Sequence, residues 1–220
     1  MQDAARSDRV LVAASLEGEP VQVVVETAAD GVRQRPLVGL DLARRFAALT
    51  FDGVRVDGDE LLGGGAAALD LQLQRAATLA AVETVGAMDE LFAMTVAYSK
   101  DRIAFGRPIG SFQALKHLMA DLALGLETAK AAVSAAVEAL DRGADDAAEI
   151  VSMAAAFVGE QGAETAQQCL QIHGGIGYTW EHDLHLLMRR IQTNAALYGT
   201  PTWHRERVCA LHGFGEGGAA

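Results

Sequence analysis

The first part of the chain carries apolar residues in the pattern of β-strands. β-Branched side chains dominate residues 10–15 and 21–27, which a turn-like Glu-Gly-Glu-Pro segment separates. Residues 46–56 alternate around Asp52-Gly53, a pair typical of tight turns. The pattern predicts a small antiparallel β unit that is too short to close into a barrel. Its strand edges would need cover from another segment or chain.

The pattern changes after the glycine run at 63–65, where long alanine-rich segments with helical spacing begin. Helix-breaking residues fall at about 107–110, 142–143 and 174–177, where connections are expected. Long helices joined by short links favour a mainly α, antiparallel bundle. We therefore predict a β unit in residues 1–65 and a four-helix-bundle-like domain in 66–220. Helices are expected at about 68–103, 111–142, 145–173, 181–197 and 201–212.

Composition narrows the functional classes. The formal net charge of −11 disfavours nucleic acid and anionic membrane surfaces as partners. Cys169 and Cys209 lie far apart, so neither a disulfide framework nor a zinc site is expected, and a reducing cytoplasm fits. The first ten residues lack the apolar segment of a signal peptide, and no apolar run reaches membrane-spanning length.

Three motifs exceed what a generic bundle requires. They are YSKDRIAFGRPIGSFQ at 98–113, QIHGGIGYT at 171–179, and LMRR at 187–190 followed by YGT at 198–200. In this order and spacing they resemble the C-terminal domain of the acyl-CoA dehydrogenase family. Residues 41–54 are similar to the end of that family's middle β domain. The resemblance implies FAD-linked α,β-dehydrogenation of an acyl-CoA thioester in fatty acid metabolism, and absence of the N-terminal helical domain and half of the middle domain.

The resemblance also assigns cofactor contacts, and their chemistry suits FAD. Arg102, at the end of a long helix, can bind a pyrophosphate with two parallel hydrogen bonds. Gly174 and Gly175 let backbone approach a ligand closely, and in the family this turn and Gln171 approach the adenosine from a neighbouring subunit. The resemblance assigns a substrate contact to Gly199. It also adds five further cofactor contacts: Phe105, Phe112, Gln113, Thr200 and Thr202.

The family's catalytic base is missing from this sequence. Many members place a glutamate directly before the Gly-Thr of the third motif, where this chain has Tyr198. A phenol with a pKa of about 10 is a poor substitute for a carboxylate. Other members place the base on the first long helix, where residues 74–77 contain no carboxylate. Glu83 lies two turns further on and is a weak candidate, with a buried or paired structural role as the alternative.

Three functional hypotheses remain open. The first is a truncated subunit that contributes half of an FAD site within a homo-oligomer or a heteromer with a longer acyl-CoA dehydrogenase-like subunit. The second is a stand-alone enzyme with a relocated base. The third is a non-catalytic structural bundle or a degenerate fragment. Taken singly, Arg102 also fits a helix-end cation, and 171–175 also fits a helix C-cap.

Overall fold

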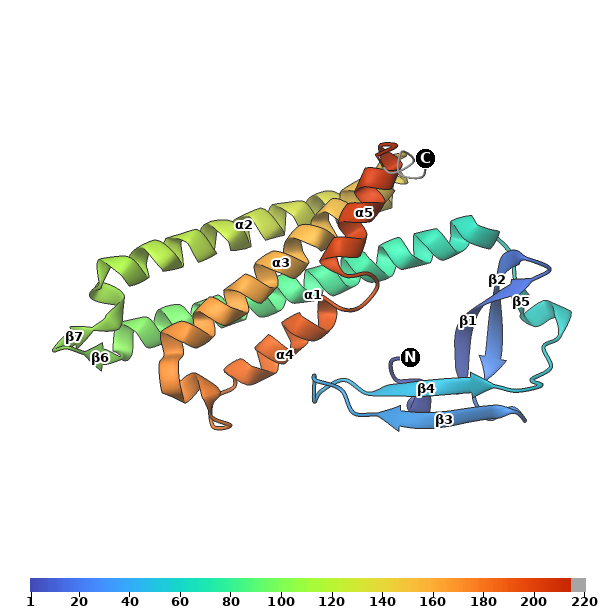
Figure 1. Cartoon of the computed structure of the whole chain (residues 1–220), viewed down its shortest axis with the longest axis horizontal. Coiled ribbons are helices and arrows are strands. Elements are labelled where there is room, and N and C mark those ends of the chain that lie inside the picture. The colour runs from blue at the N-terminus through green and yellow to red at the C-terminus, as the bar shows by residue number, and fades with distance from the viewer. Residues whose placement is uncertain (215–220) are drawn as a thin grey trace, which may run out of the picture. The chain divides into compact units, whose positions relative to one another are not determined.

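The computed structural model describes residues 1–214 and contains two compact units. The first unit comprises Met1–Leu73, and the second begins at Gln74. The boundary falls inside the first long helix, α1 (Gly65–Asp101). Figure 1 shows most of the strands in the first unit and most of the helical residues in the second. Within residues 1–214, no helix is both long and apolar enough to cross a membrane.

The first unit is built from short antiparallel strands. β1 (Arg9–Leu16) and β2 (Glu19–Glu26) form a hairpin, and β5 (Leu61–Leu62) pairs with the other side of β2. The hairpin turn has positive φ angles at Glu17 and Gly18, 55° and 90°, as a two-residue type I′ turn requires. The 3-10 turns of this unit are η1 (Ala4–Arg6) and η2 (Gly58–Glu60).

The second strand pair differs from the sequence prediction. β4 (Phe46–Phe51) ends where the turn at Asp52-Gly53 was expected, and residues 54–56 form no strand. Its partner is β3 (Val32–Leu37), which precedes it. The chain does bend at Asp52-Gly53, where Gly53 has a φ of 66°, but the strand expected after this turn is absent, so the turn joins no hairpin. β3 is almost wholly exposed and holds two arginines and a proline, so it lacks the alternation that identifies a half-buried strand.

A small apolar core holds the first unit together. Val10, Val23 and Val25 of the β1–β2 hairpin are buried with Ala47 of β4 and Ala4 of η1. The buried side chains of this core are small, and most residues of β1 other than Val10 are exposed. The predicted antiparallel β unit is thus present, with a modest hydrophobic contribution to its stability.

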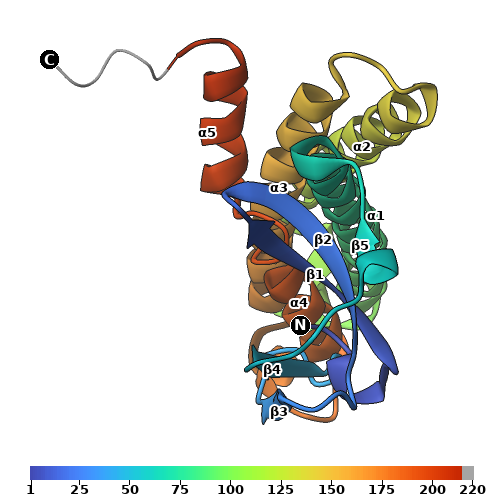
Figure 2. The ribbon, with the colours of Figure 1, turned by 90° about the vertical axis from the view of Figure 1, so that its right-hand side faces the viewer.

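The second unit is the predicted mainly α bundle. The ranges predicted from periodicity match five observed helices, although α4 is shorter than expected. The remaining elements are α2 (Gln113–Arg142), α3 (Ala147–His173), α4 (Leu184–Asn194), α5 (Pro201–Leu211), β6 (Ile103–Ala104), β7 (Arg107–Pro108), η3 (Ile109–Ser111) and η4 (Gly174–Tyr178). Figures 1 and 2 show α1, α2 and α3 lying side by side.

One core joins the first four helices. Met88 and Leu91 of α1 have no exposed surface and pack with Leu126 of α2, Val158 of α3 and Ile191 of α4. Burial of these large side chains stabilises the bundle, because each buried aliphatic side chain contributes about 1.5–3 kcal/mol. The bundle therefore provides a rigid frame for the connections between its helices, which carry much of the three sequence motifs.

Candidate functional site

A β-hairpin follows α1 and carries the first motif. β6 and β7 pair around Phe105 and Gly106, whose φ angles of 53° and 77° form a left-handed two-residue turn. This turn leaves the Phe105 side chain 96% exposed. The backbone of Arg102 is held on both sides, because its N–H donates to Tyr98 at 2.8 Å and its carbonyl accepts from Ile109 at 2.8 Å. The Arg102 side chain is exposed, so the hairpin offers a cation and a flat apolar face to solvent.

The hairpin is braced against the start of α2. The guanidinium of Arg107 lies 4.1 Å from the centre of the Phe112 ring, and Phe105 meets Phe112 edge to face at 6.2 Å. Phe112 is half-buried, and the next residue, Gln113, is exposed and contacts the His117 ring at 3.3 Å. The cation–π contact of Arg107 is a role that the sequence did not indicate. It joins the hairpin to the first turn of α2.

The second motif lies at the same end of the bundle as this hairpin. The Tyr98 ring stacks on His173 at 4.6 Å, and its hydroxyl donates to the His173 carbonyl at 3.3 Å. Gln171 is exposed, and a Cβ added at Gly175 would meet no atom within 4 Å. Gly174 ends α3 with a φ of 61°. The turn is thus a helix C-cap, and it also leaves backbone open to a ligand.

His173 is a packed side chain. It is 2% exposed, its Nδ1 lies 2.8 Å from the Cys169 carbonyl, and its ring meets His182 at 4.7 Å. Burial lowers the pKa of His173 and the nearby His182 lowers it further, whereas the hydrogen bond to Cys169 acts in the opposite direction. Its Nε2 is buried without a hydrogen-bond partner in residues 1–214, so a proton there would be unsatisfied.

Acid should therefore destabilise the bundle. The pKa of His173 is lower in the folded chain than the unfolded value of about 6.5, so the unfolded state binds more protons below neutral pH. The stability that the neutral His173 side chain contributes is fully present above the unfolded pKa and is lost as the pH falls through the folded pKa. Urea unfolding followed by circular dichroism of the helices should show this loss. His173→Gln should reduce the dependence of the unfolding free energy on pH. An equal reduction by His117→Gln, a change at an exposed histidine, would contradict this assignment.

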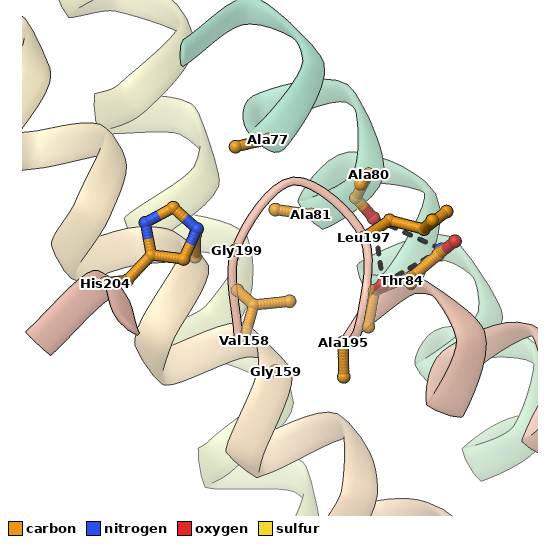
Figure 3. A pocket seen from close by; sticks show the side chains of 12 residues that line it. Ala77, Ala80, Ala81, Thr84, Val158, Gly159, Ala195, Leu197, Gly199 and His204 are labelled. Atoms are coloured by element: carbon orange, nitrogen blue, oxygen red, sulfur yellow. Dashed lines mark hydrogen bonds between the residues drawn. The ribbon is translucent and has the colours of Figure 1, made fainter. Parts of the chain in front are cut away.

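The third motif is divided between α4, which contains residues 187–190, and the link to α5, which contains residues 198–200. Tyr198 is 41% exposed and has a φ of 59°, which is strained for a residue other than glycine. The Thr200 hydroxyl caps α5 by accepting a hydrogen bond from the Trp203 N–H at 3.2 Å, and Thr202 is exposed in the first turn. Figure 3 shows the link arching over small side chains of α1 and α3, above a cavity of about 20 Å³. That volume holds about one water molecule.

His204 holds the strained link from below. Its side chain is 2% exposed and forms a hydrogen bond to the backbone of Tyr198. Burial lowers the pKa of His204, the charge of Arg207 adds to this effect, and the bond to Tyr198 opposes it. The imidazole also closes the space beside Gly199 (Figure 3). The conformation at 198–199 is therefore built into the packing around α5.

Gly199→Ala should destabilise the helical unit by about 1–3 kcal/mol, the usual range for local backbone strain. The φ of Gly199 is 112°, and an added Cβ would lie 2.5 Å from Trp203 Cε3 and 2.8 Å from His204 Nε2. Thermal unfolding measures the loss. Gly86→Ala is the matched control, because nothing lies within 4 Å of its added Cβ in the middle of α1, and it should stabilise. Equal effects of the two changes would contradict the role of Gly199.

The candidate base Glu83 is already engaged. Its carboxylate forms an ion pair with Arg190, and its Oε2 accepts a hydrogen bond from Asn194 at 3.1 Å. The same Asn194 amide lies 3.1 Å from the Thr84 hydroxyl, which fixes α4 against α1. This network favours the structural interpretation of Glu83, because protonating the carboxylate would weaken the ion pair.

The motifs form two groups in space. The hairpin and the Gln171–Gly175 turn lie at the end of α1, whereas Gly199 and His204 line the cavity beside residues 77–84 of α1. At a rise of 1.5 Å per residue, Thr84 and the end of α1 are about 25 Å apart. One chain therefore presents two separate surfaces, one with Arg102 and one with Tyr198.

Comparison with known proteins places this arrangement in a family. Residues 63–210 match the acyl-CoA dehydrogenase C-terminal domain. Acyl-CoA dehydrogenase IpdE2 of Mycolicibacterium smegmatis is 38% identical over 179 residues, which cover 81% of this chain and 53% of that protein. The chain thus spans about half the length of this relative.

Solved structures show the same fold. An acyl-CoA dehydrogenase from Geobacillus kaustophilus is 25% identical with a TM-score of 0.89, and the match covers 96% of this chain and 58% of that chain. The ChsE4-ChsE5 complex of Mycobacterium tuberculosis, at 24% identity and a TM-score of 0.90, covers 98% of this chain and 58% of its own. From its motifs, its helical unit and these matches, the chain belongs to the acyl-CoA dehydrogenase family.

Proposed function

We propose that this chain contributes part of an FAD site to a longer acyl-CoA dehydrogenase-like subunit. In this proposal, Arg102 binds the cofactor pyrophosphate, while Phe105, Phe112 and Gln113 border it. The turn with Gln171, Gly174 and Gly175 contacts the adenosine end. When bound, FAD would supply the hydride acceptor for α,β-dehydrogenation of an acyl-CoA. The chain's own residues bind and orient the cofactor.

The unpaired guanidinium of Arg102 is the observation that carries the proposal. Among residues 1–214, no carboxylate or hydrogen-bond acceptor engages its side chain, although the protein has a net charge of −11. An exposed arginine next to a 96% exposed phenylalanine suits a phosphate and a flat ring system. The open backbone at Gly175 suits close approach of the same ligand. The residues present therefore fit FAD.

The separation of the two surfaces supports sharing between subunits. Arg102 follows the end of α1, whereas the link with Tyr198 lies beside the part of α1 that contains Thr84, about 25 Å away along the helix axis. A reacting centre beside Tyr198 and a cofactor end held by Arg102 would therefore belong to two different sites in an assembled complex. In this proposal, Thr200 and Thr202 contact the cofactor of the second site, and Gly199 contacts its substrate.

The relatives support a partnered assembly. A structure with the same fold is a complex of two components, ChsE4 and ChsE5. This chain matches about half the length of such proteins. In this proposal a longer partner supplies the remaining contacts. This chain has Tyr198 at the usual position of the base, so in this proposal turnover occurs at the site whose base belongs to the partner. We propose an acyl-CoA as the substrate of the complex.

The absorption spectrum of the purified chain tests the proposal. The chain should bind little FAD alone and should retain it after mixing or co-expression with a longer acyl-CoA dehydrogenase homologue. The longer homologue alone is the control, and it should retain less FAD than the two chains together. The alternative is a non-catalytic bundle, and it would be favoured if the assembled chains stay colourless in the presence of added FAD.

A further inference from the structure

Within residues 1–214, no strand pairs with the outer edge of β1. β1 is the terminal strand of the order β1-β2-β5, and it pairs with β2 without interruption from Arg9↔Glu26 to Leu16↔Glu19. It is eight residues long and contains neither lysine nor proline. Natural proteins usually protect such edges with charges, proline, bulges or short strands. The edge of β1 has only one charged side chain, Arg9, which pairs with Glu26 at 2.9 Å.

The register shows which backbone groups face outward. In a two-residue hairpin, the closing pair Leu16↔Glu19 is hydrogen-bonded, and pairs then alternate along the ladder. The N–H and C=O groups of the odd-numbered positions therefore point away from β2. These residues are Arg9, Leu11, Ala13 and Ser15. In residues 1–214 none of these four backbone units takes part in a hydrogen bond with another segment.

We propose that the β1 edge pairs antiparallel with the β1 edge of a second copy of this chain. This pairing would join the three-stranded sheets of the two copies into one continuous six-stranded sheet. The register is centred on Val12, which faces Val12 of the second copy. Leu11 then lies opposite Ala13, and Arg9 lies opposite Ser15. All four outward positions find partners, and no like charges meet.

The side chains of β1 suit this symmetric contact. Leu11 is 36% and Leu16 52% exposed, whereas Val10 is buried in the unit's core. The centre of the strand, from Val10 to Ala14, is uncharged, and apart from Leu11 its side chains are β-branched or small, which favours strand pairing. The contact is isologous, as expected for a two-fold dimer. It belongs to the first unit and does not rest on the FAD proposal, whose residues lie in the second.

A disulfide tests the register in the full chain. Cys209→Ser removes the exposed native cysteine, and Cys169 is buried. In this background Val12→Cys should form a disulfide-linked dimer under mild oxidation, because facing residues of a non-hydrogen-bonded pair are within disulfide reach. Ala14→Cys is the control, since the two cysteines would be about 13 Å apart. Equal cross-linking of both variants, or no cross-linking of Val12→Cys, would overturn the proposal.

Charge changes at Ser15 give a second, independent readout. Ser15→Arg places arginine opposite Arg9 twice in each dimer, and Ser15→Glu places an opposite charge there. The dimer Kd from sedimentation equilibrium should rise roughly 2- to 30-fold in the first and fall by a similar factor in the second. Ser15 is exposed, so both variants should fold. A strand of a longer partner on this edge would instead leave the pure chain monomeric in every variant, which would overturn self-pairing.

Discussion

Replacing Arg102 with alanine is expected to weaken FAD binding in the assembled complex by about 10- to 150-fold. A hydrogen bond to a charged group contributes about 1.5–3 kcal/mol, and the pyrophosphate would lose such a partner. The exposed guanidinium has no competing acceptor within the described chain, so its loss should leave the fold intact. Quenching of flavin fluorescence during titration of the complex with FAD gives the dissociation constant.

Matched variants separate the site from general charge effects. Arg55→Ala removes the same charge from an exposed position in the first unit and should leave FAD binding unchanged. Arg102→Lys should give an intermediate result, because an ammonium keeps the charge without the planar fork of donors. Full retention of flavin by Arg102→Ala, in a complex whose parent is yellow, would show that the assignment of the phosphate site is wrong.

Steric block of the adenosine approach offers a second route to the same outcome. At Gly175 an added Cβ meets nothing within 4 Å, so Gly175→Val should be accommodated by the chain itself. The new side chain would instead occupy the space where the ligand approaches the turn. Reduced flavin retention with unchanged thermal stability would then identify ligand contact rather than misfolding.

Helices were the most predictable part of this structure, for a clear physical reason. Alanine-rich segments have high intrinsic helix propensity, and turns such as Arg142-Gly143 stop them where the chain reverses. β3 could not be recognised because it is an exposed edge strand with Arg33, Arg35 and Pro36. Its only consistent signal is pairing with β4, which is a tertiary property. The strand was therefore missed while its more apolar partner was found.

The candidate site was predictable only in part. Motif order indicated Arg102 and Gly174 as neighbours of a cofactor, and both are accessible in the structure. The stack of Tyr98 on His173 joins residues 75 positions apart, and the ion pair of Glu83 with Arg190 spans 107 positions. Such contacts depend on how helices pack, and helical spacing alone gives only the face on which each residue lies. The choice between a base and a structural carboxylate at Glu83 needed those contacts.

The isolated chain is expected to show no reduction of an artificial electron acceptor with added FAD and any acyl-CoA. General base catalysis contributes about 10²- to 10⁴-fold, and Tyr198 offers no carboxylate at the usual position. Glu83 is held by Arg190 and Asn194, so its carboxylate serves the packing of α4 on α1. In the proposed assembly Arg102 and Tyr198 also serve separate sites, so one chain alone would not gather the cofactor and the reacting carbons at one centre. Steady-state assays with a panel of chain lengths measure the turnover.

Installing a carboxylate at Tyr198 tests the missing step directly. In the assembled complex, Tyr198→Glu should raise turnover at this chain's site by up to about 10²- to 10⁴-fold, provided that the backbone of 198–199 keeps its present conformation. His204 and Gly199 hold that conformation, and a glutamate would present its side chain from the same exposed position. Tyr198→Phe is the control, because it removes the phenol hydroxyl without adding a base. Turnover by the unmodified chain alone that disappears in Glu83→Gln would refute this account and identify Glu83 as the base.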